Sequence, residues 1–239
     1  MSGLPPVLLL DLDDTILDLS RSAQRLWTTL CHRFAPDLAP GTDPESLLAA
    51  LREATATFWR DGEARRWGVF DLERARRVIA ADAFSRTGAG SGVAAFAFAD
   101  TFSRERLDSI EPFPGAIETL DTLRERGVRL GLVTNGRSKT QREKIERFEL
   151  GSRFDAIAIE EEVGFGKPDV RVFRHVLSRL DAAPCDAWMV GDNLEADIAG
   201  ARSAGVHAIW HDFESRGLPE DAPATPDRVV RAILELLEG

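Results

Sequence analysis

The sequence predicts an α/β protein with a parallel sheet and an all-helical unit inserted after the first strand. Three observations support this fold class. Residues 7–10 form a continuous apolar run, which is typical of a strand buried on both faces. Residues 19–109 show only the helical spacing of apolar residues. From Gly115 onward, short apolar runs alternate with helical segments, and this alternation indicates parallel strands joined by right-handed crossovers.

The inserted unit is expected to contain helices over residues 20–34, 44–60, 70–86 and 93–108. Asp43 followed by Pro44 is a typical N-cap and first helical residue. Residues 110–115 contain two prolines and a glycine, so they end the last helix and suggest a stiff hinge, together with residues 16–19. The predicted domains are therefore an α/β core, residues 1–18 and 110–239, and a helical domain, residues 19–109.

The core elements follow from the same patterns. Gly127 is a C-cap signal, Ser138 with Gln141 resembles a capping box, and Pro168 favours a helix start. Glu160–Glu162 form an acidic run that we expect to be a solvated loop. Strands are expected at residues 7–10, 128–133, 156–159, 187–190 and 206–210, and helices at residues 116–126, 138–148, 170–180, 194–204 and 227–237.

Composition narrows the classes of function. The chain has 239 residues, a net charge of −10 and no basic block, which argues against a nucleic-acid polymer as partner. Its apolar runs are far shorter than the roughly 20 residues of a membrane span, so no membrane association is expected. The two cysteines, Cys31 and Cys185, have no metal-ligand spacing and are expected to be unpaired thiols. These features predict a cytoplasmic protein. We expect a monomer or a homodimer, between which the sequence does not decide.

Polar residues follow four of the predicted strands. The first strand could simply end in a solvated acidic turn, but in a parallel sheet the ligand site lies beyond the carboxyl ends of the strands, where these residues would meet. Chance gathering from four separate segments is improbable, which favours a functional site. The residues concerned are Asp11 and Asp13 after the first strand, Thr134, Asn135 and Gly136 after the second, Lys167 after the third, and Asp192, Asn193 and Asp197 after the fourth.

The carboxylates suit a divalent metal and phosphoryl transfer. Mg²⁺ prefers oxygen ligands, which Asp11, Asp192 and the backbone carbonyl of Asp13 can supply. Beside a bound cation Asp11 can act as a nucleophile and form an aspartyl-phosphate. Asp13 can then protonate the leaving alcohol and later take a proton from water.

The remaining candidates bind the phosphate or orient the groups that do. Thr134 and the amides near Asn135 and Gly136 precede a predicted helix, whose N-terminus favours anions. Lys167 is expected to hold the nucleophile and the phosphate together. Asp197, Asn193 and Thr15 are expected in the outer shell of the site.

These motifs resemble those of the haloacid dehalogenase-like hydrolase superfamily. DLDDT, a strand ending in TNG, GKPD and GDNLEAD occur in the superfamily's order, and the resemblance covers the whole chain. It implies a Rossmann-like three-layer α/β/α core with strand order 5-4-1-2-3, a helical cap of the C1 type, and a Mg²⁺-dependent phosphatase acting on a small phosphorylated metabolite.

Some alternatives within this resemblance remain. A phosphosugar mutase or phosphotransferase shares all four motifs. A 2-haloacid dehalogenase resembles the chain at the nucleophile but lacks a carboxylate at the position of Asp13, and a non-catalytic phosphometabolite-binding module has no need of the carboxylate cluster. In the expected cap, Trp59 and Trp67 flank arginines that include Arg60, and Arg60 and Trp67 are candidate substrate contacts in a loop.

Overall fold

The computed structural model describes residues 3–68 and 70–238, apart from the side chain of Arg65. The chain divides into two compact units. The core unit comprises Met1–Asp18 and Glu111–Gly239, and the helical unit comprises Leu19–Ile110. No helix in the described ranges combines the length and apolar character that crossing a membrane requires.

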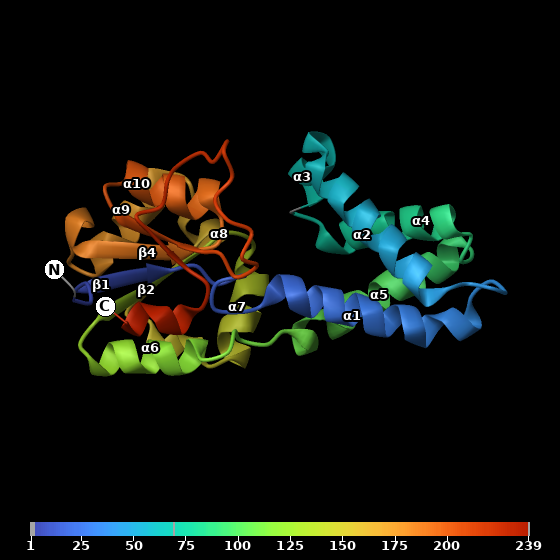
Figure 1. The fold of residues 1–239 in the computed structure, drawn as a ribbon, viewed down its shortest axis with the longest axis horizontal. Coiled ribbons are helices and arrows are strands. Elements are labelled where there is room, and N and C mark those ends of the chain that lie inside the picture. Colours follow the sequence, from blue (N-terminus) through green and yellow to red (C-terminus); the bar gives the residue numbers. More distant parts are fainter. Residues whose placement is uncertain (1–2, 69, 239) are drawn as a thin grey trace. The chain divides into compact units, whose positions relative to one another are not determined.

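The core unit is built on a six-stranded parallel sheet with the order β3-β2-β1-β4-β5-β6 (Figure 1). The predicted α/β class and the relative order of the first five strands are confirmed, and β6 extends the sheet beyond β5. Every residue of central β1 is buried, as expected for a strand covered on both faces. The strands are β1 (Val7–Leu10), β2 (Arg129–Thr134), β3 (Ala156–Ile159), β4 (Ala187–Gly191), β5 (His207–His211) and β6 (Arg228–Val230).

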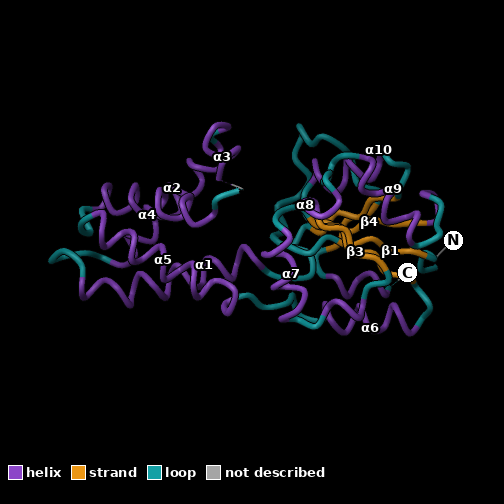
Figure 2. Tube along the Cα trace, turned by 180° about the vertical axis from the view of Figure 1, so that it is seen from behind, coloured by secondary structure: helices purple, strands orange, loops and turns teal. Residues whose placement is uncertain are grey.

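Helices cover both faces of this sheet, so its strands form the middle of three layers (Figure 2). Helices α9 and α10 lie on one face and α6 on the other. Phe173 of α9 is fully buried among residues of the sheet core. The helices of this unit are α6 (Ala116–Glu125), α7 (Ser138–Arg147), α8 (Glu160–Val163), α9 (Val170–Arg179) and α10 (Gly200–Ser203), with short helical turns η2 (Leu150–Arg153), η3 (Pro184–Asp186), η4 (Leu194–Ala199) and η5 (Ile233–Leu237).

The predicted C-terminal helix over residues 227–237 is wrong. Arg228–Val230 form β6 instead, and only Ile233–Leu237 make a helical turn. Strand β6 pairs with β5, and the Asp227 carboxylate accepts a hydrogen bond from the Ala208 N–H at 2.8 Å. The ladder to β5 satisfies the backbone of β6, so tertiary pairing overrides the helical periodicity of the sequence.

Two local predictions also differ from the structure. The acidic run is helix α8 rather than a loop, and its three carboxylates bind groups at the start of α7. The helix expected over residues 194–204 begins as the π-helical turn η4 and continues as α10. The periodicity of apolar residues does not distinguish a π turn from an α turn.

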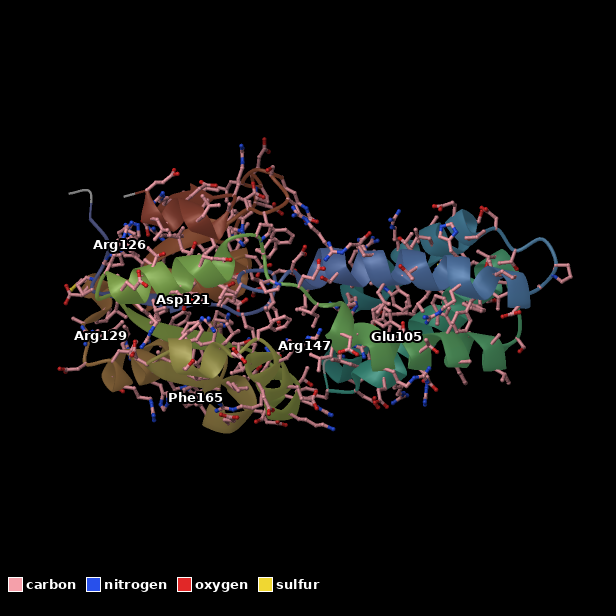
Figure 3. All side chains as sticks on the ribbon, turned by 90° about the horizontal axis from the view of Figure 1, so that it is seen from below. Glu105, Asp121, Arg126, Arg129, Arg147 and Phe165 are labelled. Atoms are coloured by element: carbon pink, nitrogen blue, oxygen red, sulfur yellow. The ribbon has the colours of Figure 1, made fainter. Side chains whose placement is uncertain are left out.

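The helical unit has a hydrophobic core of its own. Trp27 stacks on Phe102 with ring centroids 3.7 Å apart and lies 5.5 Å from Phe98. At its surface, Arg33 pairs with Glu105 at 2.8 Å, and Glu105 is labelled in Figure 3. Its helices are α1 (Leu19–Phe34), α2 (Pro44–Arg60), α3 (Gly62–Gly68), α4 (Leu72–Thr87) and α5 (Gly92–Ser109), with the turn η1 (Ala35–Asp37).

Four of these helices agree with the predicted ranges, and α3 was not predicted. The expected N-cap of α2 is confirmed, because the Asp43 carboxylate accepts from the Ser46 N–H at 2.8 Å. Residues 62–68 are too few for a periodic pattern to identify as a helix. Trp67 therefore lies in a short helix rather than in a loop, and Arg60 ends α2.

Both thiols are free, as the sequence predicts, and the structure shows that Cys31 is buried and Cys185 is exposed.

Candidate active site

Asp11 lies directly after β1, where β1, β2 and β4 present their carboxyl ends. Its backbone N–H extends the sheet ladder by donating to the Val190 carbonyl at 3.0 Å. Its side chain is buried, and Oδ1 lies 2.5 Å from the Lys167 Nζ atom. The same ammonium lies 2.6 Å from Oδ1 of Asp197 in η4. One buried lysine therefore contacts both Asp11 and Asp197.

Three carboxylates converge at this point. Asp11, Asp192 and Asp197 each offer an oxygen, and these oxygens all lie within 4.8 Å of one another. Burial raises the pKa of Asp11 from 3.8 to about 7, and the neighbouring carboxylates oppose its ionisation further. Burial, with the charges of Asp11 and Asp197, raises the pKa of Asp192 to about 9. The ammonium of Lys167 alone therefore does not keep Asp11 and Asp192 fully ionised at neutral pH.

This donor set fits a hard divalent cation. All three candidate ligands are carboxylate oxygens, which Mg²⁺ prefers over the nitrogen and sulfur donors that select zinc or copper. Three carboxylates against one ammonium leave two uncompensated negative charges if all are ionised, which is the charge of one divalent cation. Asp11 and Asp192 were expected as ligands, and Asp197, expected in the outer shell, lies within the same cluster.

Asp13 binds residues of α7 that the sequence analysis did not assign to the site. Lys144 Nζ lies 2.6 Å from both carboxylate oxygens of Asp13. The Gln141 amide donates to Asp13 Oδ2 at 3.1 Å and to Thr134 Oγ1 at 2.5 Å. The predicted capping box is wrong, because Arg137 is the N-cap residue, without a side-chain cap, and Gln141 points into the site.

The loop after β2 is held by residues that follow β3. The Asn135 side chain accepts from the Lys167 N–H at 2.8 Å and donates to the Lys167 carbonyl at 2.7 Å. The Gly136 N–H donates to Glu160 Oε2 at 2.9 Å. Asn135 thus fixes the backbone of Lys167, and Glu160 takes up the Gly136 amide that was expected to face a phosphate.

The turn η4 places Asp197 beneath the end of β4. Asn193 caps η4 through its side chain, and its N–H donates to Asp197 Oδ2 at 2.9 Å. A Cβ atom on Gly191 would lie 2.2 Å from the Asp197 carboxyl carbon. Only glycine leaves enough space at the end of β4 for this buried aspartate.

The other predicted residues have less specific surroundings. Thr15 is fully buried, and its Oγ1 has no hydrogen-bond partner among the residues that the structure describes. In the helical unit, Arg60 is exposed and its Nε donates to the Ala56 carbonyl at 3.1 Å. Trp67 packs edge-on against Phe58, and the Arg74 guanidinium lies 4.4 Å from its ring centroid. The functional roles expected for these three residues stay predictions.

Comparison with known proteins identifies the family. The family model of haloacid dehalogenase-like hydrolases matches residues 6–205. The chain belongs to this family. A phosphoserine phosphatase from Thermus thermophilus is 35% identical over 255 residues, which cover 96% of this chain and 97% of that protein. A glyceraldehyde 3-phosphate phosphatase from Methanopyrus kandleri is 31% identical over 222 residues, which cover 90% and 89%.

A solved structure supports the same assignment for this haloacid dehalogenase-like hydrolase. The HAD-hydrolase YfnB from Bacillus subtilis, in a crystal form bound to magnesium, aligns with a TM-score of 0.72 and 25% identity. The alignment covers 99% of this chain and 98% of that one. Family membership and the named phosphatases together support a phosphoric monoester hydrolase as the enzyme class.

Strand β5, which carries none of the four motifs of this hydrolase, also contacts the site loops. The Trp210 Nε1–H donates to the Asp192 carbonyl at 2.8 Å. His211 Nδ1 lies 3.0 Å from the Asp14 carbonyl, which can only accept, so Nδ1 is the protonated nitrogen of this pair. The end of β5 thereby fixes the backbone of both loops that carry predicted metal ligands.

Lysine usage is the signal that could have identified Lys144. The sequence of this hydrolase contains three lysines, Lys139, Lys144 and Lys167, although arginine is abundant. Two of them, Lys144 and Lys167, are buried, and each binds a carboxylate of the DLDDT motif. Lysine therefore occupies two positions where a compact point charge meets a carboxylate of the site.

Proposed function

We propose that this hydrolase is a Mg²⁺-dependent phosphatase that cleaves a small phosphomonoester through an aspartyl-phosphate on Asp11. The observation that carries the proposal is the position of Asp11, buried between Lys167 and the carboxylates of Asp192 and Asp197. Asp13 stands two residues further along the same loop, and an aspartate near the nucleophile can serve as its general acid–base.

In the first half-reaction an Asp11 carboxylate oxygen attacks phosphorus. The bond between phosphorus and the ester oxygen breaks, and Asp13 gives its proton to the departing alcohol. Lys167 counters the negative charge of the nucleophile and of the phosphoryl group, since two anions otherwise repel each other. Asp11, Asp192 and the backbone carbonyl of Asp13 would hold Mg²⁺ with Asp197 nearby, and the ion supplies charge neutralisation for the phosphoryl oxygens.

In the second half-reaction water attacks the phosphorus of the aspartyl-phosphate. Asp13, left as a carboxylate, takes the water proton, and inorganic phosphate leaves as the Asp11 carboxylate is restored. Thr134 and the Asn135 N–H would bind phosphoryl oxygens just before α7, since the Gly136 N–H donates to Glu160.

The helical unit is proposed to act as the cap that selects the substrate, with Arg60 and Trp67 as candidate contacts. The substrate class is a small phosphorylated metabolite, in keeping with the relatives named for phosphoserine and glyceraldehyde 3-phosphate. Oligomeric state and cytoplasmic location stay predictions.

The first test is hydrolysis of p-nitrophenyl phosphate and of a panel of phosphorylated metabolites, with and without Mg²⁺. We expect metal-dependent release of inorganic phosphate, and we expect Asp11→Asn to reduce it to background because the amide is not a nucleophile. Phosphorus NMR distinguishes free phosphate from an isomerised phosphosugar, which a mutase would produce.

The matched control is Asp186→Asn, an exposed aspartate of the core unit outside the proposed machinery. It should retain the metal-dependent turnover if it folds. Turnover by Asp11→Asn at the wild-type rate, or wild-type turnover that EDTA leaves unchanged, would contradict the proposal.

A further inference from the structure

We propose that Lys144 and Gln141 of α7 are positioning residues that orient Asp13 and Thr134 for the two proton transfers. This inference rests on the proposed function, because it assigns partners to the acid–base of that reaction. Neither residue lies in the four motifs, and both are buried, with Lys144 3% exposed and Gln141 2% exposed.

The contacts explain why a lysine is buried at this position. An unpaired ammonium inside a protein is costly, whereas a carboxylate at hydrogen-bond distance compensates it. Lys144 Nζ lies 2.6 Å from each oxygen of Asp13, a two-pronged contact that restricts rotation of the carboxylate. Asp13 is 29% exposed at its side chain, so one part of it still faces the solvent from which substrate arrives.

Counting lone pairs indicates which oxygen exchanges the proton. An ionised carboxylate has about four acceptor sites, two on each oxygen. Lys144 occupies one on each oxygen, and Gln141 occupies a second on Oδ2. The remaining site is on Oδ1, so the geometry assigns Oδ1 as the atom that would protonate the leaving alcohol and later accept the water proton.

Gln141 also orients the hydroxyl of Thr134. An ionised Asp13 can only accept, so the Gln141 NH₂ group, and not its carbonyl, faces Asp13. Its other hydrogen goes to Thr134 Oγ1, which therefore acts as an acceptor there. The Thr134 O–H is left to donate elsewhere, and a phosphoryl oxygen is the acceptor that the proposed reaction provides.

The test separates steps that need Asp13 from a step that does not. Propyl phosphate has a poor leaving group and needs a proton donor, whereas p-nitrophenolate leaves without one. For Lys144→Met we expect turnover of propyl phosphate to fall about 10- to 100-fold, within the share that general acid–base catalysis contributes. The pre-steady-state burst of p-nitrophenol should keep its rate within about threefold, while the steady-state phase slows. We expect Lys144→Arg, which keeps the charge, to retain more turnover than Lys144→Met.

Asp13→Asn serves as the reference and Lys139→Met as the matched control. Lys139 is an exposed lysine of the same helix, and its replacement should leave both substrates unaffected. If Lys144 acts through Asp13, the double variant Asp13→Asn/Lys144→Met should be no slower than Asp13→Asn alone. The double variant removes both members of this ion pair, so it answers the question even if Lys144→Met alone fails to fold.

Two results would overturn the inference. Lys144→Met could slow the p-nitrophenol burst as much as propyl phosphate turnover, or the double variant could lose a further tenfold over Asp13→Asn. In both cases the proposed function would stand, since wild type and Lys139→Met would still hydrolyse phosphate esters with Mg²⁺. Absence of metal-dependent turnover in wild type would instead refute the proposed function, and this inference with it.

Discussion

At the scale of single residues, the three clustered carboxylates dominate the chemistry of the molecule. Asp11 and Asp192 both have a raised pKa because they are buried among like charges. A group that holds its proton to a higher pH when folded than when unfolded stabilises the folded state below its unfolded pKa and loses that contribution as pH rises. The carboxylates that equip the site for a cation therefore destabilise the metal-free chain at neutral and alkaline pH.

The first prediction concerns Asp192. The metal-free protein should lose thermal stability as pH rises from about 4, the unfolded value of such a carboxyl, through about 9, the folded value for Asp192. Asp192→Asn should flatten this decline and raise the melting temperature at pH 8. Thermal unfolding in EDTA at a series of pH values measures both effects.

Adding Mg²⁺ provides the control for this experiment. The cation should stabilise wild type most at high pH, where the carboxylates are ionised, and should stabilise Asp192→Asn much less. A metal-free wild type whose melting temperature increases from pH 5 to pH 8 would contradict the account.

The sequence predicts that the side chains of the four motifs converge on one site. It does not predict which residues of α7 contact Asp13. Asp11, Lys167 and Asp192 follow strands of one parallel sheet, so their proximity follows from topology. Gln141 and Lys144 lie on a helix with a plausible capping pattern, and that local signal concealed their orientation. Which face of α7 meets Asp13 depends on how the helix packs, and packing is not encoded in the spacing of one segment.

At the scale of elements, the approach of η4 to β4 is the tightest feature of the site. Gly191 ends β4, and a side chain there would overlap the Asp197 carboxyl group. We predict that Gly191→Ala costs about 1–3 kcal/mol of unfolding free energy, the usual cost of forcing a methyl group into a packed region. It should also reduce metal-dependent turnover, because Asp197 must move.

Urea unfolding and phosphatase assays on Gly191→Ala test this prediction. The control is Gly92→Ala at the start of α5, where an added Cβ meets nothing within 4 Å. That substitution should leave stability unchanged or slightly increase it, because alanine favours the helix. Equal stability of Gly191→Ala and wild type would show that Asp197 is not confined as described.

Helices and strands were predicted correctly where the sequence pattern of the segment itself determines them, and were missed where distant partners do. Strand β3 and helix α2 have the boundaries that their sequence patterns predict. Strand β6 was missed because residues 227–237 carry a helical period, yet the open edge of β5 offers hydrogen bonds that only an extended segment can use. The acidic residues of α8 were assigned to solvent because their partners, the amide N–H groups near the start of α7, lie more than 20 positions earlier.

At the scale of the whole molecule, each of the two units has buried hydrophobic residues of its own among the described part of the chain. The helical unit packs around Trp27, Phe84 and Phe98, whereas the core unit includes Phe173 among the residues beside the sheet. Because each core is enclosed within its own unit, we expect damage to one to leave local stability of the other largely unchanged.

Matched phenylalanine truncations test this expectation. Phe98→Ala in the helical unit and Phe173→Ala in the core unit should each cost about 3–5 kcal/mol locally, since both rings are fully buried. Hydrogen exchange should then increase within residues 19–110 for Phe98→Ala and within residues 111–238 for Phe173→Ala. Increased exchange of both units in both variants would indicate a single cooperative structure.

Trp210 and His211 matter for comparing related sequences, because the four motifs do not include them. These two residues hold the loops of Asp192 and Asp14 from a strand outside every motif. We therefore expect a homologue that keeps all four motifs but lacks Trp210 and His211 to be a weaker enzyme, because both loops would lose a hydrogen bond.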